Sequence, residues 1–65
     1  MVFIFYKTNN VFIAENRLKD KGIICEIIPT PVQDKAYCGI CLEIDTVLES
    51  IVTSIINDLE HKVLK

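Results

Sequence analysis

The first twenty residues change from a short apolar run to a segment with helical spacing. Val2–Tyr6 is a continuous run of β-branched and aromatic residues, which at this length predicts a strand rather than a helix. Thr8–Asn10 are residue types that cap helices, and the pattern that follows them is helical. Gly22 stands where this helix should stop. The apolar residues expected on the buried face of this helix are Val11, Ala14 and Leu18.

The middle of the chain predicts two further strands separated by a loop. Ile23–Ile28 is again rich in β-branched residues and predicts the second strand. Pro29-Thr30-Pro31 ends it, because proline cannot donate a hydrogen bond to a neighbouring strand. The polar residues Gln33-Asp34-Lys35 predict a loop that leads to Cys38, and Ile40–Ile44 predicts the third strand.

The last third of the chain predicts a second helix. Thr46 and Glu49 have the spacing of a capping box, in which each side chain bonds a free backbone N–H group of the first turn. We expect His61 on the outer part of this helix, near its C-terminus. The apolar stripe of the helix consists of Leu48, Ile51, Val52, Ile55 and Leu59.

The element order β-α-β-β-α predicts a single α+β domain over residues 1–65. A right-handed crossover between the first two strands, followed by a returning strand, is typical of a ferredoxin-like arrangement without its last strand. We therefore predict a three-stranded sheet of order 1-3-2, with both helices on one face.

Strand alternation assigns the apolar side chains to the two faces of this sheet. The residues expected beneath the helices are Val2, Ile4, Ile23, Cys25, Ile27, Ile40, Leu42 and Ile44. The residues expected on the open face are Phe3, Phe5, Ile24, Ile28 and Cys41. Because such an apolar face is unusual on a monomer, we predict a homodimer through Phe3, Phe5, Ile24 and Ile28.

Composition and charge exclude several classes of protein. A net charge of −2 and a pI near 5.2 argue against a general nucleic-acid binder, which needs clustered Lys and Arg. No apolar run approaches the ~20 residues of a membrane span, and the start of the chain lacks the pattern of a signal peptide. We expect a cytoplasmic protein with reduced cysteines, whose odd number, 3, excludes complete pairing within one chain.

The stretch Tyr37-Cys38-Gly39-Ile40-Cys41 has the C-x-x-C spacing of redox and metal sites. A thioredoxin-type pair opens a helix, whereas a strand follows here, and residues three apart on a strand face opposite ways. A disulfide would need a bulge at Gly39. Zinc would need four ligands, and only Cys25 and His61 are left to complete them, so we expect no metal and no cofactor.

The remaining choice is between buried structural thiols and one reactive thiol. Free cysteine is often buried, which suits Cys25 and Cys41. Cys38 differs because it follows a polar loop and precedes Gly39, which would let a partner approach closely. We select Cys38 as the reactive thiol, with Cys41 as a possible second one.

Several short motifs together resemble the selenium/sulfur carrier-like proteins, a small bacterial family. An early Thr before a helix, an Ala-Glu pair, a Gly-Ile pair, an I-P-x-P segment and a Cys-Gly pair recur in the family order. The residues that carry this resemblance are Thr8, Ala14-Glu15, Leu18, Gly22-Ile23, Ile28-Pro29-Thr30-Pro31 and Cys38-Gly39. The sequence departs from the family in having Val32 in place of an Arg and Ala36-Tyr37 in place of serines, although Lys35 offers a cation nearby.

The resemblance implies that Cys38 carries sulfur or selenium as a persulfide or its selenium analogue. A protein of this kind is a carrier rather than a self-sufficient catalyst, and a cysteine desulfurase is a possible donor. One alternative is a small homodimeric interaction module in which the cysteines are structural. Another is a metal site formed by Cys38 and Cys41 across a dimer.

Overall fold

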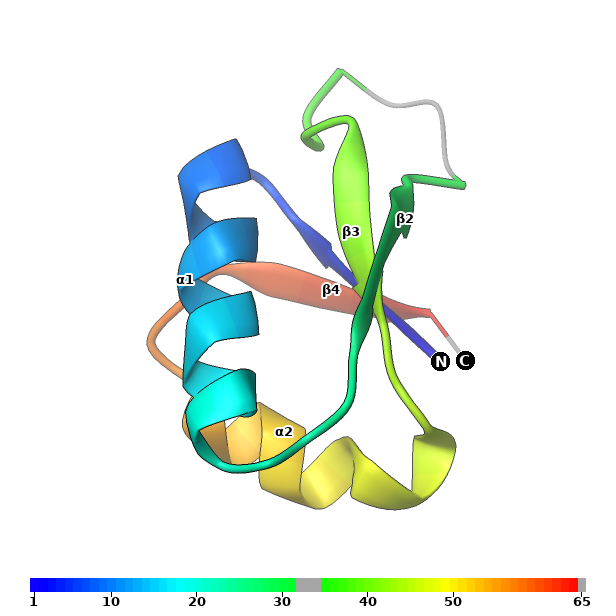
Figure 1. The fold of residues 1–65 in the computed structure, drawn as a ribbon. Helices are drawn as coiled ribbons and strands as arrows, with labels where there is room; N and C mark the ends of the chain where they lie inside the picture. Colours follow the sequence, from blue (N-terminus) through cyan, green and yellow to red (C-terminus); the bar gives the residue numbers. More distant parts are fainter. Residues whose placement is uncertain (32–34, 65) are drawn as a thin grey trace.

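The structure is a computed structural model that describes residues 1–31 and 35–64. In this part of the chain four strands form one antiparallel sheet in the order β2-β3-β1-β4, and two helices and a short 3-10 turn accompany it (Figure 1). The elements in chain order are β1 (Val2–Phe5), α1 (Thr8–Asp20), β2 (Glu26–Pro29), β3 (Ile40–Glu43), η1 (Thr46–Leu48), α2 (Glu49–Ile55) and β4 (His61–Leu64).

The prediction of a three-stranded sheet is wrong, because the end of the chain forms a fourth strand. β4 pairs with β1 over its full length, from Val2 opposite Leu64 to Phe5 opposite His61. β3 lies between β1 and β2, so the fourth strand extends the sheet on the far side of β1. β1 therefore lies inside the sheet, where both of its edges are hydrogen-bonded.

The predicted faces of β1 are reversed. Phe3 lies opposite Leu42 on β3 and opposite Val63 on β4, and these side chains belong to the core beneath the helices. Phe3 and Phe5 are both fully buried there. Aromatic rings bury more apolar area than Val2 or Ile4 can, so the core takes the face that carries them.

The other face of the sheet carries Ile4, Cys41 and Ile28, which are cross-strand neighbours. Ile4 and Cys41 are fully buried although they point away from the helices, and Ile28 is half-buried. Phe3 and Phe5 were expected on an exposed dimer surface, and this is wrong because both side chains are buried in the core. Ile24 is 88% exposed but precedes β2, which begins three residues later than predicted, at Glu26.

Helix α1 begins earlier than predicted and ends where predicted. Its first residue is Thr8, and the preceding Lys7 makes no side-chain cap hydrogen bond. At the C-terminus the Gly22 N–H donates to Lys19 O at 3.0 Å and the Ile23 N–H donates to Leu18 O at 2.9 Å. This pair of bonds is a Schellman motif, which requires the left-handed backbone that Gly22 adopts at φ 74°.

The second helix is shorter than predicted. The predicted capping box is wrong, because Thr46 lies in η1, which Asp45 caps: the Asp45 carboxylate accepts a hydrogen bond from the Val47 N–H at 3.2 Å. α2 begins only at Glu49, and Leu48 before it makes no side-chain cap hydrogen bond. The helix ends at Ile55, before the last residue of the predicted stripe. Val52 is buried as expected, whereas Ile51 is 53% exposed.

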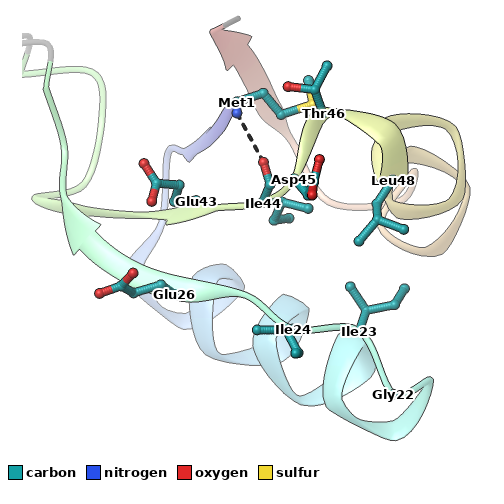
Figure 2. Close-up of a pocket in the computed structure, with 10 residues that line it drawn as sticks. All are labelled: Met1, Gly22, Ile23, Ile24, Glu26, Glu43, Ile44, Asp45, Thr46 and Leu48. Carbon is teal, nitrogen blue, oxygen red and sulfur yellow. Dashed lines mark hydrogen bonds between the residues drawn. The ribbon is translucent and has the colours of Figure 1, made fainter.

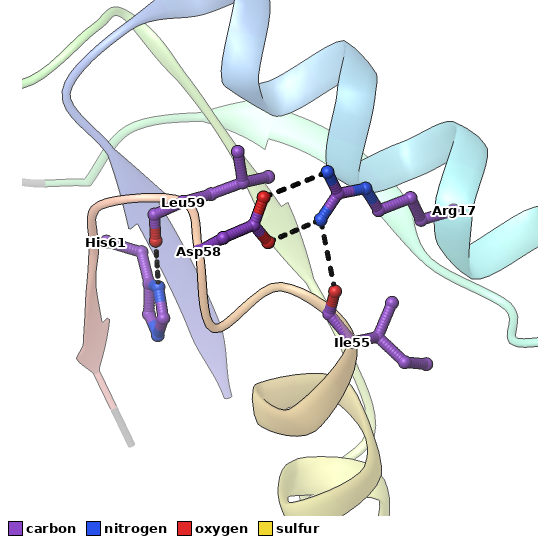
Figure 3. Close-up of polar contacts among 5 residues, drawn as sticks. All are labelled: Arg17, Ile55, Asp58, Leu59 and His61. Atoms are coloured by element: carbon purple, nitrogen blue, oxygen red, sulfur yellow. Dashed lines mark hydrogen bonds and ion pairs between the residues drawn. The ribbon is translucent and has the colours of Figure 1, made fainter.

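Arg17 joins α1 to the connection between α2 and β4 (Figure 3). Its guanidinium bonds both oxygens of Asp58, at 2.6 and 3.0 Å, and donates to the Ile55 carbonyl at 3.2 Å. The prediction that His61 lies on the surface of the second helix is wrong, because His61 is the first residue of β4. One ring nitrogen lies 2.7 Å from Leu59 O, and the ring packs 5.5 Å from that of Phe3.

The ion pair predicts a pH-dependent contribution to stability. Arg17 lowers the pKa of Asp58, mainly through the side-chain hydrogen bond. Because the pKa is lower in the folded state, the contribution is complete above the unfolded value of about 3.9 and is lost as the pH falls through the folded pKa. We expect the difference in unfolding free energy between the wild type and Asp58→Asn to shrink from neutral pH toward about pH 2. Urea unfolding at each pH measures it.

The control for this experiment is Asp20→Asn, which removes an exposed carboxylate outside the ion pair. Its difference from the wild type should not follow the same pH course. A constant difference between wild type and Asp58→Asn across this pH range would contradict the assigned role of the pair.

Candidate functional site

Cys38 lies at the end of the sheet where β1 finishes and β3 begins. Its N–H donates a hydrogen bond to the Phe5 carbonyl at 3.0 Å, which ties the residue to the last position of β1. The half-buried side chain packs against the core cluster on the helix side of the sheet. The backbone of Cys38 is therefore fixed although it stands just outside a strand.

Thr30 holds the same segment from the other side. Its N–H donates to the Gly39 carbonyl at 3.0 Å, and its hydroxyl donates to the Cys38 carbonyl at 2.8 Å. Two consecutive carbonyls are thus bonded by one residue of the proline-flanked segment Pro29–Pro31. These bonds fix the orientation of the Cys38-Gly39 peptide.

The half-buried Cys38 stands beside an exposed glycine. The Cys38 thiol donates to the Ile40 carbonyl, with the sulfur 2.9 Å from the oxygen. Gly39 is exposed, and a Cβ added to it would meet no atom within 4 Å. The fold does not need a glycine here for backbone strain or internal packing, so the space above it is open to another molecule.

Cys41 lies on the opposite face of the sheet from Cys38. It neighbours Leu42, which faces the core, so Cys41 points away from the helices, beside Ile4 and Ile28. It is fully buried, and its thiol lies 3.6 Å from Ile28 O. Burial raises the pKa of the Cys41 thiol, an effect that a hydrogen bond with Thr30 partly offsets.

Cys25 lies in the coil before β2 and is half-buried. Burial raises the pKa of its thiol, and the carboxylate of Glu15 raises it further. The thiolate is the nucleophilic form of cysteine, so these shifts reduce the nucleophilic fraction of Cys25 and Cys41 at neutral pH. Both residues are thereby disfavoured as reactive thiols.

The described residues contain no group of three or more His, Cys, Asp or Glu side chains that could hold a metal ion. Cys38 and Cys41, the pair considered for zinc, lie on opposite faces of the sheet. Lys35 is exposed. The departure from the family at Val32 lies outside the described residues, as do the loop residues Gln33 and Asp34.

Two contacts of the site did not follow from the sequence. Thr30 stood out only as the variable residue of I-P-x-P, and no local pattern reveals that it bonds two carbonyls eight and nine residues away. Tyr6 and Tyr37 form an aromatic pair whose ring centroids are 5.2 Å apart. Tyr6 directly follows Phe5 and Tyr37 directly precedes Cys38, so the hydrogen bond between Phe5 and Cys38 brings the tyrosines together, and no sequence pattern signals that bond.

Within residues 1–31 and 35–64, no helix is both long enough and apolar enough to cross a bilayer.

The chain matches a family model that is described as "Putative Se/S carrier protein-like", over residues 1–65. The motifs of the sequence indicated the same family, and the match extends over the whole chain. No curated protein matches the chain. No solved structure matches it either.

Proposed function

Because the chain belongs to the Se/S carrier protein-like family, we propose that it carries sulfur or selenium on the thiol of Cys38. The observation that supports this most strongly is the contrast among its three cysteines. Cys38 is held by its backbone beside an exposed glycine, whereas burial raises the thiol pKa of both Cys25 and Cys41. A carrier needs one accessible thiol and a surface for donor and acceptor proteins, but no substrate cavity.

The proposed loading step is a transfer of sulfane sulfur. The Cys38 thiolate attacks the terminal sulfur of a persulfide on the donor, such as a cysteine desulfurase. A new S–S bond forms on Cys38, the S–S bond of the donor persulfide breaks, and the donor cysteine leaves as a thiolate that takes up a proton. No external oxidant or reductant is needed. An acceptor nucleophile then removes the terminal sulfur by the same exchange, and a selenium atom would follow the same course.

The hydrogen bonds around Cys38 suit this role. The Phe5 carbonyl and Thr30 fix the backbone on both sides, so the sulfur is presented at a defined position. A pre-positioned nucleophile avoids part of the entropic cost of the encounter with the donor. Free thiols require a reducing compartment, and we therefore propose that the carrier acts in the cytoplasm.

We expect Cys38→Ser to abolish loading. Reduced protein is incubated with a cysteine desulfurase and cysteine, and intact mass is measured without reductant. The wild type should gain the mass of one sulfur atom, and Cys38→Ser should gain none. Cys25→Ser is the matched control, because it removes another half-buried thiol, and it should load like the wild type. Equal loading of the wild type and Cys38→Ser would refute the proposal.

Gly39→Ala should slow loading without destabilising the fold. The added methyl group meets no atom of the protein within 4 Å, but it occupies the space through which the donor cysteine must approach. We expect a decrease of roughly 10-fold or more in the transfer rate, since small misplacements of reacting atoms have large kinetic effects. Quenched-flow loading followed by mass measurement gives the rate.

Gly22→Ala serves as the control for that rate. Gly22 has a left-handed backbone at φ 74°, so alanine there should lower the stability by about 1 kcal/mol and leave the loading rate of the folded protein unchanged. Equal loading rates for Gly39→Ala and the wild type would remove Gly39 from the proposed site.

A further inference from the structure

A second surface lies at the end of the sheet opposite Cys38. There the connection between α1 and β2 faces η1 across a groove, in which Ile23 points toward Leu48 and Ile24 is a further lining residue (Figure 2). β3 runs between the two ends, with Cys38 before its first residue and the groove at its last, Glu43. The groove is therefore separate from the proposed carrier site.

The groove belongs to a broader apolar surface. Ile24, which lines the groove, is 88% exposed. Ile23 also lines an adjoining hollow together with Ile51 of α2, which is 53% exposed. Side chains of this size are seldom left in water together unless another surface covers them.

Charges of opposite sign flank this apolar surface. Glu26 and Glu43 line the groove as directly opposed cross-strand residues, an arrangement of like charges that destabilises a sheet. Within the described residues no ion pair reaches either carboxylate. Lys21 lines the adjoining hollow on the other side of Ile23. The surface thus runs from acidic to apolar to basic.

We propose that this surface binds a second copy of the same chain as a two-fold symmetric dimer. A two-fold interface joins the same patch on both copies, so an acidic end meets a basic end twice. Lys21 of each copy would then approach Glu26 and Glu43 of the other and relieve their repulsion, while the exposed isoleucines cover one another. This proposal does not depend on the sulfur chemistry, and it leaves both Cys38 residues at the distal ends.

The apolar part of the proposal is tested by sedimentation velocity in reductant, from about 10 µM to about 1 mM protein, because a small patch predicts a weak dimer. We expect a reversible dimer that weakens at least about 10-fold in Ile24→Glu. The matched control is Phe12→Glu, which changes another large side chain, 47% exposed, that does not line the groove. A wild type that stays monomeric throughout, or equal effects of the two variants, would overturn the proposal.

The proposed contact between Lys21 of one copy and Glu43 of the other is tested by reversing the charge of each residue. Lys21→Glu and Glu43→Lys should each weaken the dimer, and the double variant should restore it toward wild-type affinity. A double variant weaker than either single one would overturn the arrangement. Ile24→Glu should load Cys38 at the wild-type rate, so failure of the dimer and failure of the carrier proposal are observed separately.

Discussion

A Phe3→Ala variant should lose about 3–5 kcal/mol of unfolding free energy, as is usual when a buried aromatic ring is removed. Phe3 is fully buried between Leu42 and Val63 on the helix side of the sheet. A domain of this length has roughly 3–10 kcal/mol in total. We therefore expect this one change to remove a large part of the total stability, which urea titration followed by circular dichroism would show.

The control is Phe12→Ala, since this phenylalanine lies on α1 and is 47% exposed. Its loss should be much smaller. Phe3→Asp, which would break a dimer without unfolding the chain if Phe3 were on an open face, should instead prevent folding. A folded Phe3→Asp variant of near wild-type stability would contradict the observed core.

A chain that ends at Glu60 should also fail to fold. The truncation would remove β4 and leave the edge of β1 that faces β4 without a hydrogen-bonded partner. It would also expose the rings of Phe3 and Phe5, against which Val63 and His61 now pack. The loss of hydrogen bonds and the loss of apolar burial each lower the stability of the fold. Backbone amide exchange and thermal unfolding measure the effect.

Lys62→Ala is the control for the truncation, because it keeps the strand and changes only an exposed side chain. Its stability should remain close to that of the wild type. If the chain ending at Glu60 unfolded at the same temperature as the full chain, β4 would not be an integral strand of the fold.

The strand pattern predicted three of the strands but not the faces of β1. Every position from Val2 to Phe5 is apolar, so the alternation that distinguishes a buried face from an open one is missing. The choice depends on which side chains fill the space beneath α1. That is a property of packing, and the aromatic rings are the side chains found there.

β4 was missed because Val63, one of its two apolar residues, continues the helical spacing. Val63 follows Leu59 by four residues, as Leu59 follows Ile55, so a helix extended past its actual end fits the pattern equally well. The segment is short and contains His61 and Lys62, which have no strong strand preference. Pairing with β1 decides its conformation, and a single sequence does not display that pairing.

The candidate site was partly accessible from the sequence. The Cys-Gly pair at the end of a proline-bounded loop is the reason for proposing Cys38, which stays a prediction. Strand alternation separated Cys38 from Cys41, and the two lie on opposite faces in the structure. The bonds from Thr30 and from Phe5 were not accessible, because they join segments that only the folded sheet brings together.

The most direct test of the carrier proposal is to locate the persulfide in the wild-type protein. The reduced protein is loaded by a desulfurase with cysteine, its thiols and persulfides are blocked with an alkylating reagent, and the sulfur-bearing peptide is identified by mass spectrometry. We predict that the additional sulfur lies on Cys38 in nearly all loaded molecules. Sulfur found mainly on Cys25 or Cys41, or on none of the three cysteines, would contradict the proposal.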